Sequence, residues 1–282
     1  MIRTVGIIGA GQMGGGIAQL YATHEYGVIL CDIDGSRLER SVAAIRENLE
    51  RQAEKGNIDS ALINGIVGRI RPSGDIAAVS IVDFVVEAVS ENEPLKLRIF
   101  RALDEIVRPD VILASNTSSI SITRIAAATR QPERVIGMHF MNPAPVMHLV
   151  EVIRGRATSD ETFAATASLV ARLGKEMAVS QDYPGFIVNR ILIPMINEAI
   201  FALFEGVATA EDIDKGMKLG TNQPMGPLAL ADFIGLDTVL AICTCLYEGY
   251  RDPKYRPCPL LVRMVDAGLL GRKSGEGFYN YL

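Results

Sequence analysis

The chain has 282 residues, which corresponds to about two domains at roughly 150 residues per domain. Hydrophobic residues make up 49% of it and charged residues 22%, as in globular proteins that bury a sizeable core. The 33 acidic and 28 basic residues give a formal net charge of −5 without any block of like charge. This composition argues against a polyanion-binding surface, so no nucleic-acid partner is expected.

Cysteine content and hydropathy bear on disulfides, metal sites and membrane spans. Cys31, Cys243, Cys245 and Cys258 are too few for a disulfide framework and lack metal-site spacing, so we expect reduced thiols, no metal and a cytoplasmic location. The most apolar stretch, residues 191–204, is shorter than the roughly 18 residues that a membrane span needs, so no membrane partner is expected. Because a strand pattern begins almost at the first residue, we expect no cleavable leader.

The first part of the chain alternates short apolar runs with helical patterns. Candidate strands are residues 4–8, 28–31, 82–87, 111–115 and 135–140, and candidate helices are residues 13–21, 36–55, 93–107 and 120–129. Because this is a βαβ rhythm, it predicts an α/β fold with a parallel, doubly wound sheet. The long crossover between residues 36 and 70 is expected to hold two helices, broken at Gly56-Asn57, that project as a hairpin.

After Tyr183-Pro184-Gly185 the pattern changes to helical runs alone. These runs cover residues 186–205, 210–219, 228–250 and 260–267, and Thr209 with Asp212 has the pattern of a helix N-cap. We therefore expect a sheet domain over residues 1–183, followed by an all-helical C-terminal domain over residues 184–282.

A glycine-rich turn follows the first candidate strand. Gly9, Gly11 and Gly14 form a GxGxxG pattern that opens a helix, and Asp32 follows the next candidate strand. In a Rossmann-type fold these glycines permit the tight turn, the approach of a pyrophosphate and close helix–strand packing. A carboxylate at Asp32 accepts ribose hydroxyls and repels an additional phosphate, which favours NAD over NADP. The alternative is an ordinary strand–helix turn in which Asp32 caps the next loop.

Other polar residues follow later strands at their carboxyl ends, where doubly wound sheets bind ligands. They are Glu87 and the loop Asn116-Thr117-Ser118-Ser119. Ser118 and Ser119 are equally well explained as N-caps of a helix that begins near Ile120.

His139 is the candidate acid–base residue. It lies in the apolar run 135–140, and a proline-rich turn leads from there to a second apolar run at residues 147–153. If the two runs pair antiparallel around Pro145, His139 lies directly opposite Glu151, which can hold the imidazole tautomer and raise its basicity. The alternative is a core histidine satisfied by a backbone group.

A hydride acceptor combined with a His–Glu proton relay predicts oxidation of an alcohol or the reverse reaction. The other histidines fit this role less well, because His148 would face away from Glu151 and His24 is placed as a surface or capping residue. No GxSxG elbow or P-loop occurs, which argues against serine hydrolases and P-loop NTPases.

Six segments, in order along the whole chain, resemble the short-chain L-3-hydroxyacyl-CoA dehydrogenases. The likeness is closest to the bacterial 3-hydroxybutyryl-CoA dehydrogenases of that family. The segments are GAGQMG (9–14), ASNTSS (114–119), HFMNPAPVM (139–147), PGFIVNR (184–190), PMGP (224–227) and GRKSGEGFY (271–279).

The resemblance implies roles for particular residues. His139 would be the general base in oxidation, with Glu151 as its orienting partner, and Ser118 and Asn189 would bind the substrate oxygens in a cleft between the domains. Beyond the glycine turn, the implied cofactor contacts are Asp32, Glu91, Lys96, Asn116, Asn142 and Lys273.

The resemblance also implies partners. Arg51 and Lys55, four residues apart on one face of the projecting helix, match positions that place basic residues against the phosphates of CoA. Glu54 stands where a basic residue is frequent in the family, and a solvated face of Arg51 and Lys55 with neighbouring acids is the alternative. A homodimer through residues 186–204 and 228–247 of the helical domain is expected.

The expected activity is therefore NAD-dependent, reversible oxidation of a short (S)-3-hydroxyacyl-CoA to the 3-ketoacyl-CoA. Two alternatives remain at this point. One is a dehydrogenase of the same fold that acts on a free hydroxy acid, as gulonate dehydrogenases do. The other is a noncatalytic NAD-binding or structural relative.

Overall fold

A computed structural model describes residues 2–282 of the chain, which divide into two compact units at the junction between Tyr183 and Pro184. The strands are β1 (Thr4–Ile8), β2 (Gly27–Cys31), β3 (Ile70–Ser73), β4 (Phe84–Glu87), β5 (Ile112–Ser115), β6 (Val135–Phe140), β7 (Leu149–Arg154) and β8 (Glu176–Gln181). The helices are α1 (Gln12–Thr23), α2 (Gly35–Glu54), α3 (Ile63–Gly68), α4 (Glu93–Ile106), α5 (Ile122–Ala126), α6 (Asp160–Arg172), α7 (Val188–Phe204), α8 (Ala210–Gly220), α9 (Pro227–Ile234), α10 (Leu236–Tyr250) and α11 (Pro259–Asp266).

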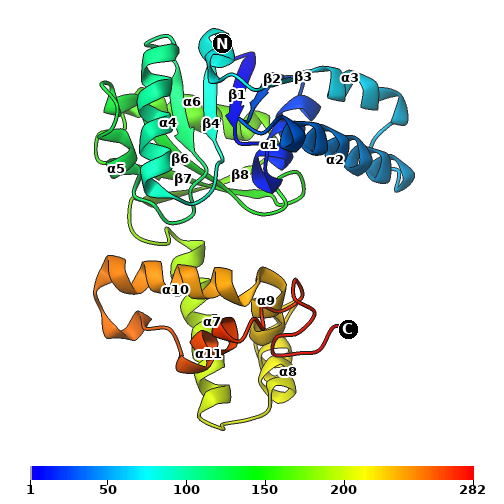
Figure 1. The fold of residues 1–282 in the computed structure, drawn as a ribbon, viewed down its shortest axis with the longest axis vertical. Helices are drawn as coiled ribbons and strands as arrows, with labels where there is room; N and C mark the ends of the chain where they lie inside the picture. The colour runs from blue at the N-terminus through cyan, green and yellow to red at the C-terminus, as the bar shows by residue number, and fades with distance from the viewer. Residues whose placement is uncertain (1) are drawn as a thin grey trace. The chain divides into compact units, whose positions relative to one another are not determined.

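The strands of the first unit form one sheet in the order β3-β2-β1-β4-β5-β6-β7-β8 (Figure 1). All neighbours are parallel except β6 and β7, so the predicted doubly wound α/β sheet is confirmed. The sequence pattern missed both edge strands and α6. Edge strands have weak apolar signals: β3 contains Pro72, which only an edge tolerates, and in β8 only Ser180 is buried.

The two faces of the sheet carry different side chains. Val5, Ile7, Phe84 and Val86 belong to the large apolar core that also includes buried side chains of α1, α2, α3 and α6. Because side chains alternate along a strand, Glu87, Ser115, His139 and Glu151 point to the opposite face. Helices α4 and α5 cover that face, since Lys96 of α4 contacts Glu87 and a Cβ at Gly137 of β6 would meet Ile122 of α5.

The predicted helical hairpin is present as α2 and α3, which lie at the edge of the first unit (Figure 1). The Asp34 carboxylate caps α2 by accepting a hydrogen bond from the Arg37 N–H, and Gly56 has φ +73 after the helix ends. The break is therefore where the sequence placed it, with a further 3-10 turn at Ser60–Leu62 before α3.

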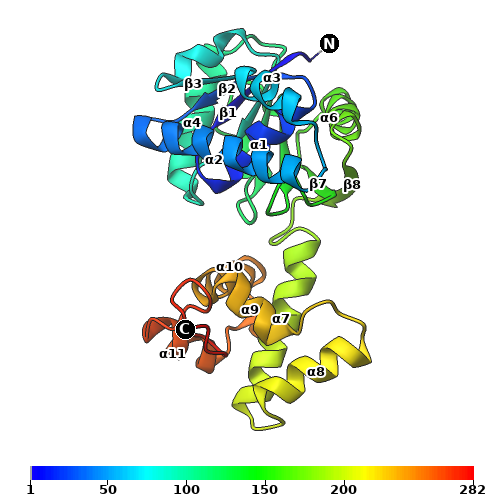
Figure 2. The same ribbon diagram turned by 90° about the vertical axis from the view of Figure 1, so that its right-hand side faces the viewer.

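In the second unit, α7 contacts each of α8, α9, α10 and α11 (Figure 2). The predicted single helix over residues 228–250 is wrong: Gly235 has φ +100 and separates α9 from α10, which meet at 99°. The predicted N-cap is confirmed, because the Asp212 N–H donates to the Thr209 hydroxyl. Within residues 2–282 no single helix is long and apolar enough to cross a membrane. Helices α9 and α10 reach the required length and apolar composition only when they are counted together, and they are bent by 99° at their junction.

Two buried carboxylates, those of Asp214 and Asp232, hold the C-terminal tail against the helices of this unit. Asp232 of α9 accepts hydrogen bonds from the N–H groups of Phe278 and Tyr279 and from the Tyr281 hydroxyl. Asp214 of α8 accepts two N–H groups at the start of α9 and the Tyr279 hydroxyl. A Cβ at Gly226, Gly271 or Gly277 would overlap Asp214 or Asp232, so the motifs at residues 224–227 and 271–279 have a packing function here.

Candidate functional site

The glycine-rich turn between β1 and α1 has the geometry that the sequence predicts. Gly9 has φ +104, and a Cβ there would lie 2.7 Å from the Ala88 carbonyl oxygen at the end of β4. A Cβ at Gly14 would overlap the Gly9 carbonyl, whereas nothing lies within 4 Å of a Cβ at Gly11. The open space at Gly11, beside the first turn of α1, suits an anionic diphosphate.

Asp32 follows β2, and its side chain is 6% exposed. Its Oδ2 accepts the Ala10 N–H at 2.9 Å and its Oδ1 accepts the Asp34 N–H at 3.0 Å, so it also caps the loop, as the alternative reading proposed. Arg37 Nη1 lies 3.4 Å from Oδ2. An ionised carboxylate has about four acceptor positions, so Asp32 can accept ribose hydroxyls in addition.

A cavity of about 260 Å³ opens beside Asp32 at the topological switch point, where β1 and β4 adjoin. Its lining is mostly apolar, with Ile33, Ile76, Leu95 and Ile99 among the side chains. Such walls suit a flat nucleobase, and the polar atoms at Asp32 suit a ribose. The residues present therefore fit the adenosine part of NAD.

The predicted register of the β6–β7 hairpin is confirmed: His139 pairs with Glu151. The imidazole Nδ1 lies 2.7 Å from Glu151 Oε2, and the Glu151 side chain is fully buried whereas that of His139 is 10% exposed. Since a carboxylate only accepts, Nδ1 carries a proton and Nε2 carries the lone pair of the neutral ring. The Glu151 carboxylate thus holds His139 through Nδ1.

Asn116 joins the loop after β5 to the end of β6, because its Oδ1 accepts the Phe140 N–H at 2.9 Å. Asn142 follows β6 and is exposed. His148 is exposed before β7, and His24 is the C-cap residue of α1, with its Nδ1 2.9 Å from the Leu20 carbonyl oxygen. Both placements agree with the sequence analysis.

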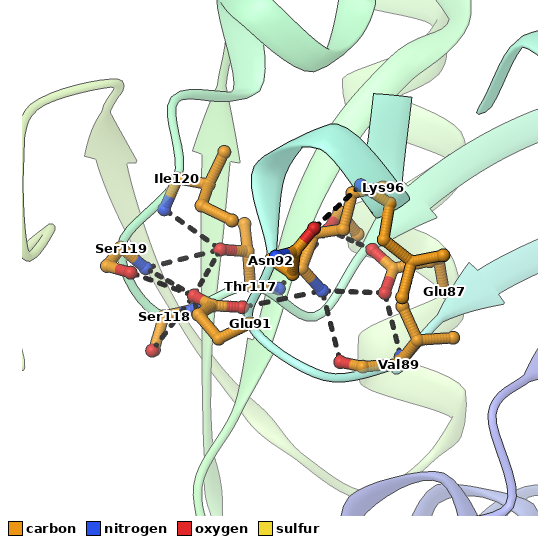
Figure 3. Close-up of polar contacts among 11 residues, drawn as sticks. Glu87, Val89, Glu91, Asn92, Lys96, Thr117, Ser118, Ser119 and Ile120 are labelled. Carbon is orange, nitrogen blue, oxygen red and sulfur yellow. Dashed lines mark hydrogen bonds and ion pairs between the residues drawn. The ribbon is translucent and has the colours of Figure 1, made fainter. Parts of the chain in front are cut away.

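Glu91 organises the serine loop after β5 (Figure 3). Its Oε1 accepts the Thr117 hydroxyl at 2.6 Å and the N–H and hydroxyl groups of both Ser118 and Ser119 at 2.9–3.2 Å. Burial raises the pKa of Glu91, but the Lys96 ammonium and these hydrogen bonds outweigh it and hold the pKa below the ordinary value. The reading of Ser118 and Ser119 as N-caps is wrong, because Ser121 caps α5.

Lys96 is 1% exposed and connects Glu91 to the sheet (Figure 3). Its Nζ lies 2.6 Å from Glu87 Oε1, 3.3 Å from the Val89 carbonyl oxygen and 3.4 Å from Glu91 Oε2. Glu87 in turn accepts the Ser115 hydroxyl at 2.6 Å. The three donors of the ammonium therefore hold the loop after β4 against the end of that strand, and Glu91 connects this loop to the loop after β5. No sequence pattern indicated this pairing, which joins residues from two strands and a helix.

A second cavity, of about 460 Å³, lies on the α1–α2 side of the glycine turn. Gly11, Arg37, Arg40 and Asn48 line it together with residues 142–145. Arg51, one turn beyond Asn48 on α2, is exposed and lies 3.9 Å from Glu47, as the solvated-face reading expects.

Three further predicted site residues are Lys55, at the end of α2, and Asn189 and Lys273, which belong to the second unit. Lys55 is the exposed C-cap residue of α2. In the second unit, Asn189 is the second residue of α7, and Lys273 forms an ion pair with Asp237.

In the part of the chain that the structure describes, no group of three or more His, Cys, Asp or Glu side chains could hold a metal ion. Cys31, Cys243 and Cys258 are buried thiols, and Cys245 is partly buried.

Comparison with known proteins covers both units. The family model for the NAD binding domain of 3-hydroxyacyl-CoA dehydrogenase matches residues 4–183, and the model for the C-terminal domain matches residues 185–281. The 3-hydroxybutyryl-CoA dehydrogenase of Bradyrhizobium diazoefficiens is 54% identical over 281 residues, covering 100% of this chain and 96% of the relative. A probable 3-hydroxybutyryl-CoA dehydrogenase of Bacillus subtilis is 52% identical over 280 residues, covering 99% and 98%.

A solved structure shows the same likeness. The crystal structure of (S)-3-hydroxybutyryl-CoA dehydrogenase from Ralstonia eutropha matches with a TM-score of 0.97 and 51% sequence identity, covering 100% of both chains. Because the family models match both units and relatives of more than half identity cover the chain, it belongs to the 3-hydroxyacyl-CoA dehydrogenase family of NAD-dependent dehydrogenases.

Proposed function

We propose that the protein catalyses the reversible oxidation of a short (S)-3-hydroxyacyl-CoA, such as 3-hydroxybutyryl-CoA, to the 3-ketoacyl-CoA. The observation that carries this proposal is the His139–Glu151 pair, a 2.7 Å contact between an imidazole and a buried carboxylate. It lies on the same sheet as the glycine turn and near the carboxyl ends of the parallel strands, where such sheets bind ligands. The relatives named for this reaction cover the whole chain.

His139 acts as the general base in oxidation and as the general acid in reduction. Glu151 holds Nδ1–H, so Nε2 takes the proton of the 3-hydroxyl group, and the imidazolium that forms is stabilised by the carboxylate. In the reverse direction the same nitrogen returns the proton to the developing alkoxide. Glu151 keeps the ring in one orientation throughout.

The NAD site is proposed at the glycine turn, with Gly9, Gly11 and Gly14 forming the diphosphate cradle and Asp32 binding the adenosine ribose. When bound, NAD accepts the hydride from the 3-carbon of the substrate. Asn116, Asn142, Glu91 and Lys273 are proposed as further contacts. We assign Lys96 mainly to holding Glu91, because its ammonium is 1% exposed and surrounded by three acceptors.

Ser118 and Asn189 are proposed to bind the substrate oxygens. For the CoA part, the cavity lined by Arg37, Arg40 and Asn48 provides a groove beside α2, and Arg51 and Lys55 follow along the same helix.

Replacing Arg51 and Lys55 together by glutamine should raise the KM for the CoA thioester a few-fold and leave the KM for NAD unchanged. Equal KM values for the thioester would assign both residues to the solvated face.

The test of the proposed function compares substrates on the purified protein. Acetoacetyl-CoA with NADH should be turned over much faster than free hydroxy or keto acids, including gulonate with NAD. Preference for a free acid would overturn the proposal in favour of the gulonate-type alternative. Absence of hydride exchange between labelled NADH and any of these substrates would favour the noncatalytic alternative.

We also propose a cytoplasmic homodimer that forms through the helical unit. Ile191 and Phe204 of α7, Phe233 of α9 and Tyr247 of α10 are large apolar side chains that are 41–67% exposed. A two-fold contact between copies would bury them. Charge substitution at Ile191 should shift the mass in solution from dimer to monomer, and a wild-type monomer would contradict the proposal. The location is supported by the cysteine content alone, because four cysteines are too few for a disulfide framework.

A further inference from the structure

We propose that Arg37 is a cofactor-specificity residue whose guanidinium can hold the 2′-phosphate of NADP and is masked by Asp32. In the wild-type protein Asp32 neutralises the guanidinium and repels the additional phosphate, so the site selects NAD. When the Asp32 charge is removed, Arg37 becomes the anchor for NADP. This inference deepens the proposed function, because it rests on Asp32 binding the adenosine ribose.

The position of Arg37 supports this role. Its Nη1 lies 3.4 Å from Asp32 Oδ2, and Arg37 lines the 260 Å³ cavity that fits adenosine. A group attached to the ribose beside Asp32 is therefore within reach of the guanidinium. The Arg37 side chain is 52% exposed and lies 3.9 Å from Asp34, so no deep burial prevents it from turning toward a ligand.

The charges around Arg37 set the cofactor preference. Arg37 is in the first turn of α2, where the Asp34 carboxylate already caps the helix by accepting the Arg37 N–H. The guanidinium, and not the helix N-terminus, is therefore the positive group that is left for an additional phosphate. Against this stands the Asp32 carboxylate, which two backbone N–H groups hold in position. A 2′-phosphate next to that fixed negative charge would be repelled, whereas two uncharged ribose hydroxyls would be bound.

The same helix provides a matched control. Arg40, one turn further on, lies 3.9 Å from Asp34 and lines the cavity on the other side of the glycine turn, but not the cavity beside Asp32. Both arginines carry the same charge on α2. A general effect of positive charge would therefore appear at both positions, and a specific contact with the 2′-phosphate only at Arg37.

The experiment measures the Kd of NADH and of NADPH by nicotinamide fluorescence in the absence of acyl-CoA. It compares the wild type with Asp32→Asn, and with Arg37→Gln or Arg40→Gln added to Asp32→Asn. Asp32→Asn should tighten NADPH binding by about 10-fold or more relative to NADH. Adding Arg37→Gln should remove about 10-fold of NADPH affinity and change NADH affinity by less than about 3-fold. Adding Arg40→Gln should leave the NADPH to NADH ratio unchanged.

Equal losses for NADH and NADPH on adding Arg37→Gln, or the same loss from Arg40→Gln, would overturn the inference. So would an unchanged NADPH to NADH ratio in Asp32→Asn. The binding arm separates these outcomes from a failure of the proposed reaction, because nicotinamide binding is read without any acyl-CoA. Thermal unfolding of each variant establishes that the folded protein is being compared.

Discussion

The two units use buried carboxylates for different purposes. In the sheet unit, Glu87 and Glu151 are bound to titratable side chains, the Lys96 ammonium and the His139 imidazole. In the helical unit, Asp214 and Asp232 are bound to backbone N–H groups and tyrosine hydroxyls of the tail and of α9. Burial alone therefore does not distinguish a catalytic carboxylate from a structural one. The partner and its role do: Glu151 holds the imidazole that is proposed to carry the proton, whereas the Lys96 ammonium and the backbone amides hold the other carboxylates in fold contacts.

The largest effect expected from this comparison is at His139. His139→Ala removes the only group that the proposal gives for accepting the substrate proton, so kcat should fall by about 10²–10⁴-fold. The Kd of NADH, measured by fluorescence, should change little, because His139 does not line the cavity beside Asp32. An active variant would refute the general-base assignment.

Replacing the carboxylate instead of the imidazole should have a smaller effect. Glu151→Gln keeps an acceptor for Nδ1–H but loses the charge that stabilises the imidazolium, so we expect kcat to fall by about 10–10²-fold. Stopped-flow turnover measures the loss of kcat, and a thermal melt of the same variant measures any loss of stability. A variant that unfolds early but keeps its kcat per folded molecule would place Glu151 in the structural class of carboxylates, with Asp214 and Asp232.

The catalytic half of this comparison could be predicted from the sequence, because it depends on local pattern. A turn centred on Pro145 sets the register that puts His139 opposite Glu151, and Gly9, Gly11 and Gly14 are read directly from their spacing. Both features are formed by contacts between residues that are close together in the sequence.

The structural half could not be predicted, because its contacts are distant in sequence. Asp232 meets Phe278 46 residues later, and Glu91 meets Ser118 27 residues later. Neither pair has a periodic signal, since one partner in each is a backbone N–H group whose residue type is unconstrained. The break at Gly235 was missed for a related reason: the apolar pattern continues across it, and only the φ of +100 reveals the change of direction.

Replacing a structural carboxylate should lower the stability of the fold and leave kcat nearly unchanged, the opposite of what is expected for a catalytic carboxylate. In Asp232→Asn, one amide N–H group would face a donor, because both oxygens of Asp232 accept hydrogen bonds. We expect a loss of about 1–3 kcal/mol in the free energy of unfolding, with kcat of the folded enzyme close to that of the wild type. Urea unfolding followed by circular dichroism measures the first quantity, since the chain has no tryptophan. A large fall in kcat without loss of stability would break the distinction between the units.

The smallest expected effect is in the pH dependence of stability, where Asp104 of the sheet unit and Asp232 of the helical unit should have opposite signs. Burial raises the pKa of Asp104 in α4, but the hydrogen bonds and charges of Arg130 and Arg134 outweigh it, so the pKa lies below its ordinary value. Its contribution is present above the unfolded pKa of about 4 and is lost as the pH falls through the folded pKa.

For Asp232 the pKa is raised, mainly by burial and also by Asp214, so its ionisation destabilises the folded state. That cost appears as the pH rises from the unfolded pKa of about 4 through the raised folded pKa. In urea unfolding between pH 3 and 7, the stability difference between wild type and Asp104→Asn should shrink toward acid, and that between wild type and Asp232→Asn should shrink toward neutral pH. The same sign in both series would mean that the tail amides stabilise an ionised Asp232 as strongly as the two arginines stabilise Asp104.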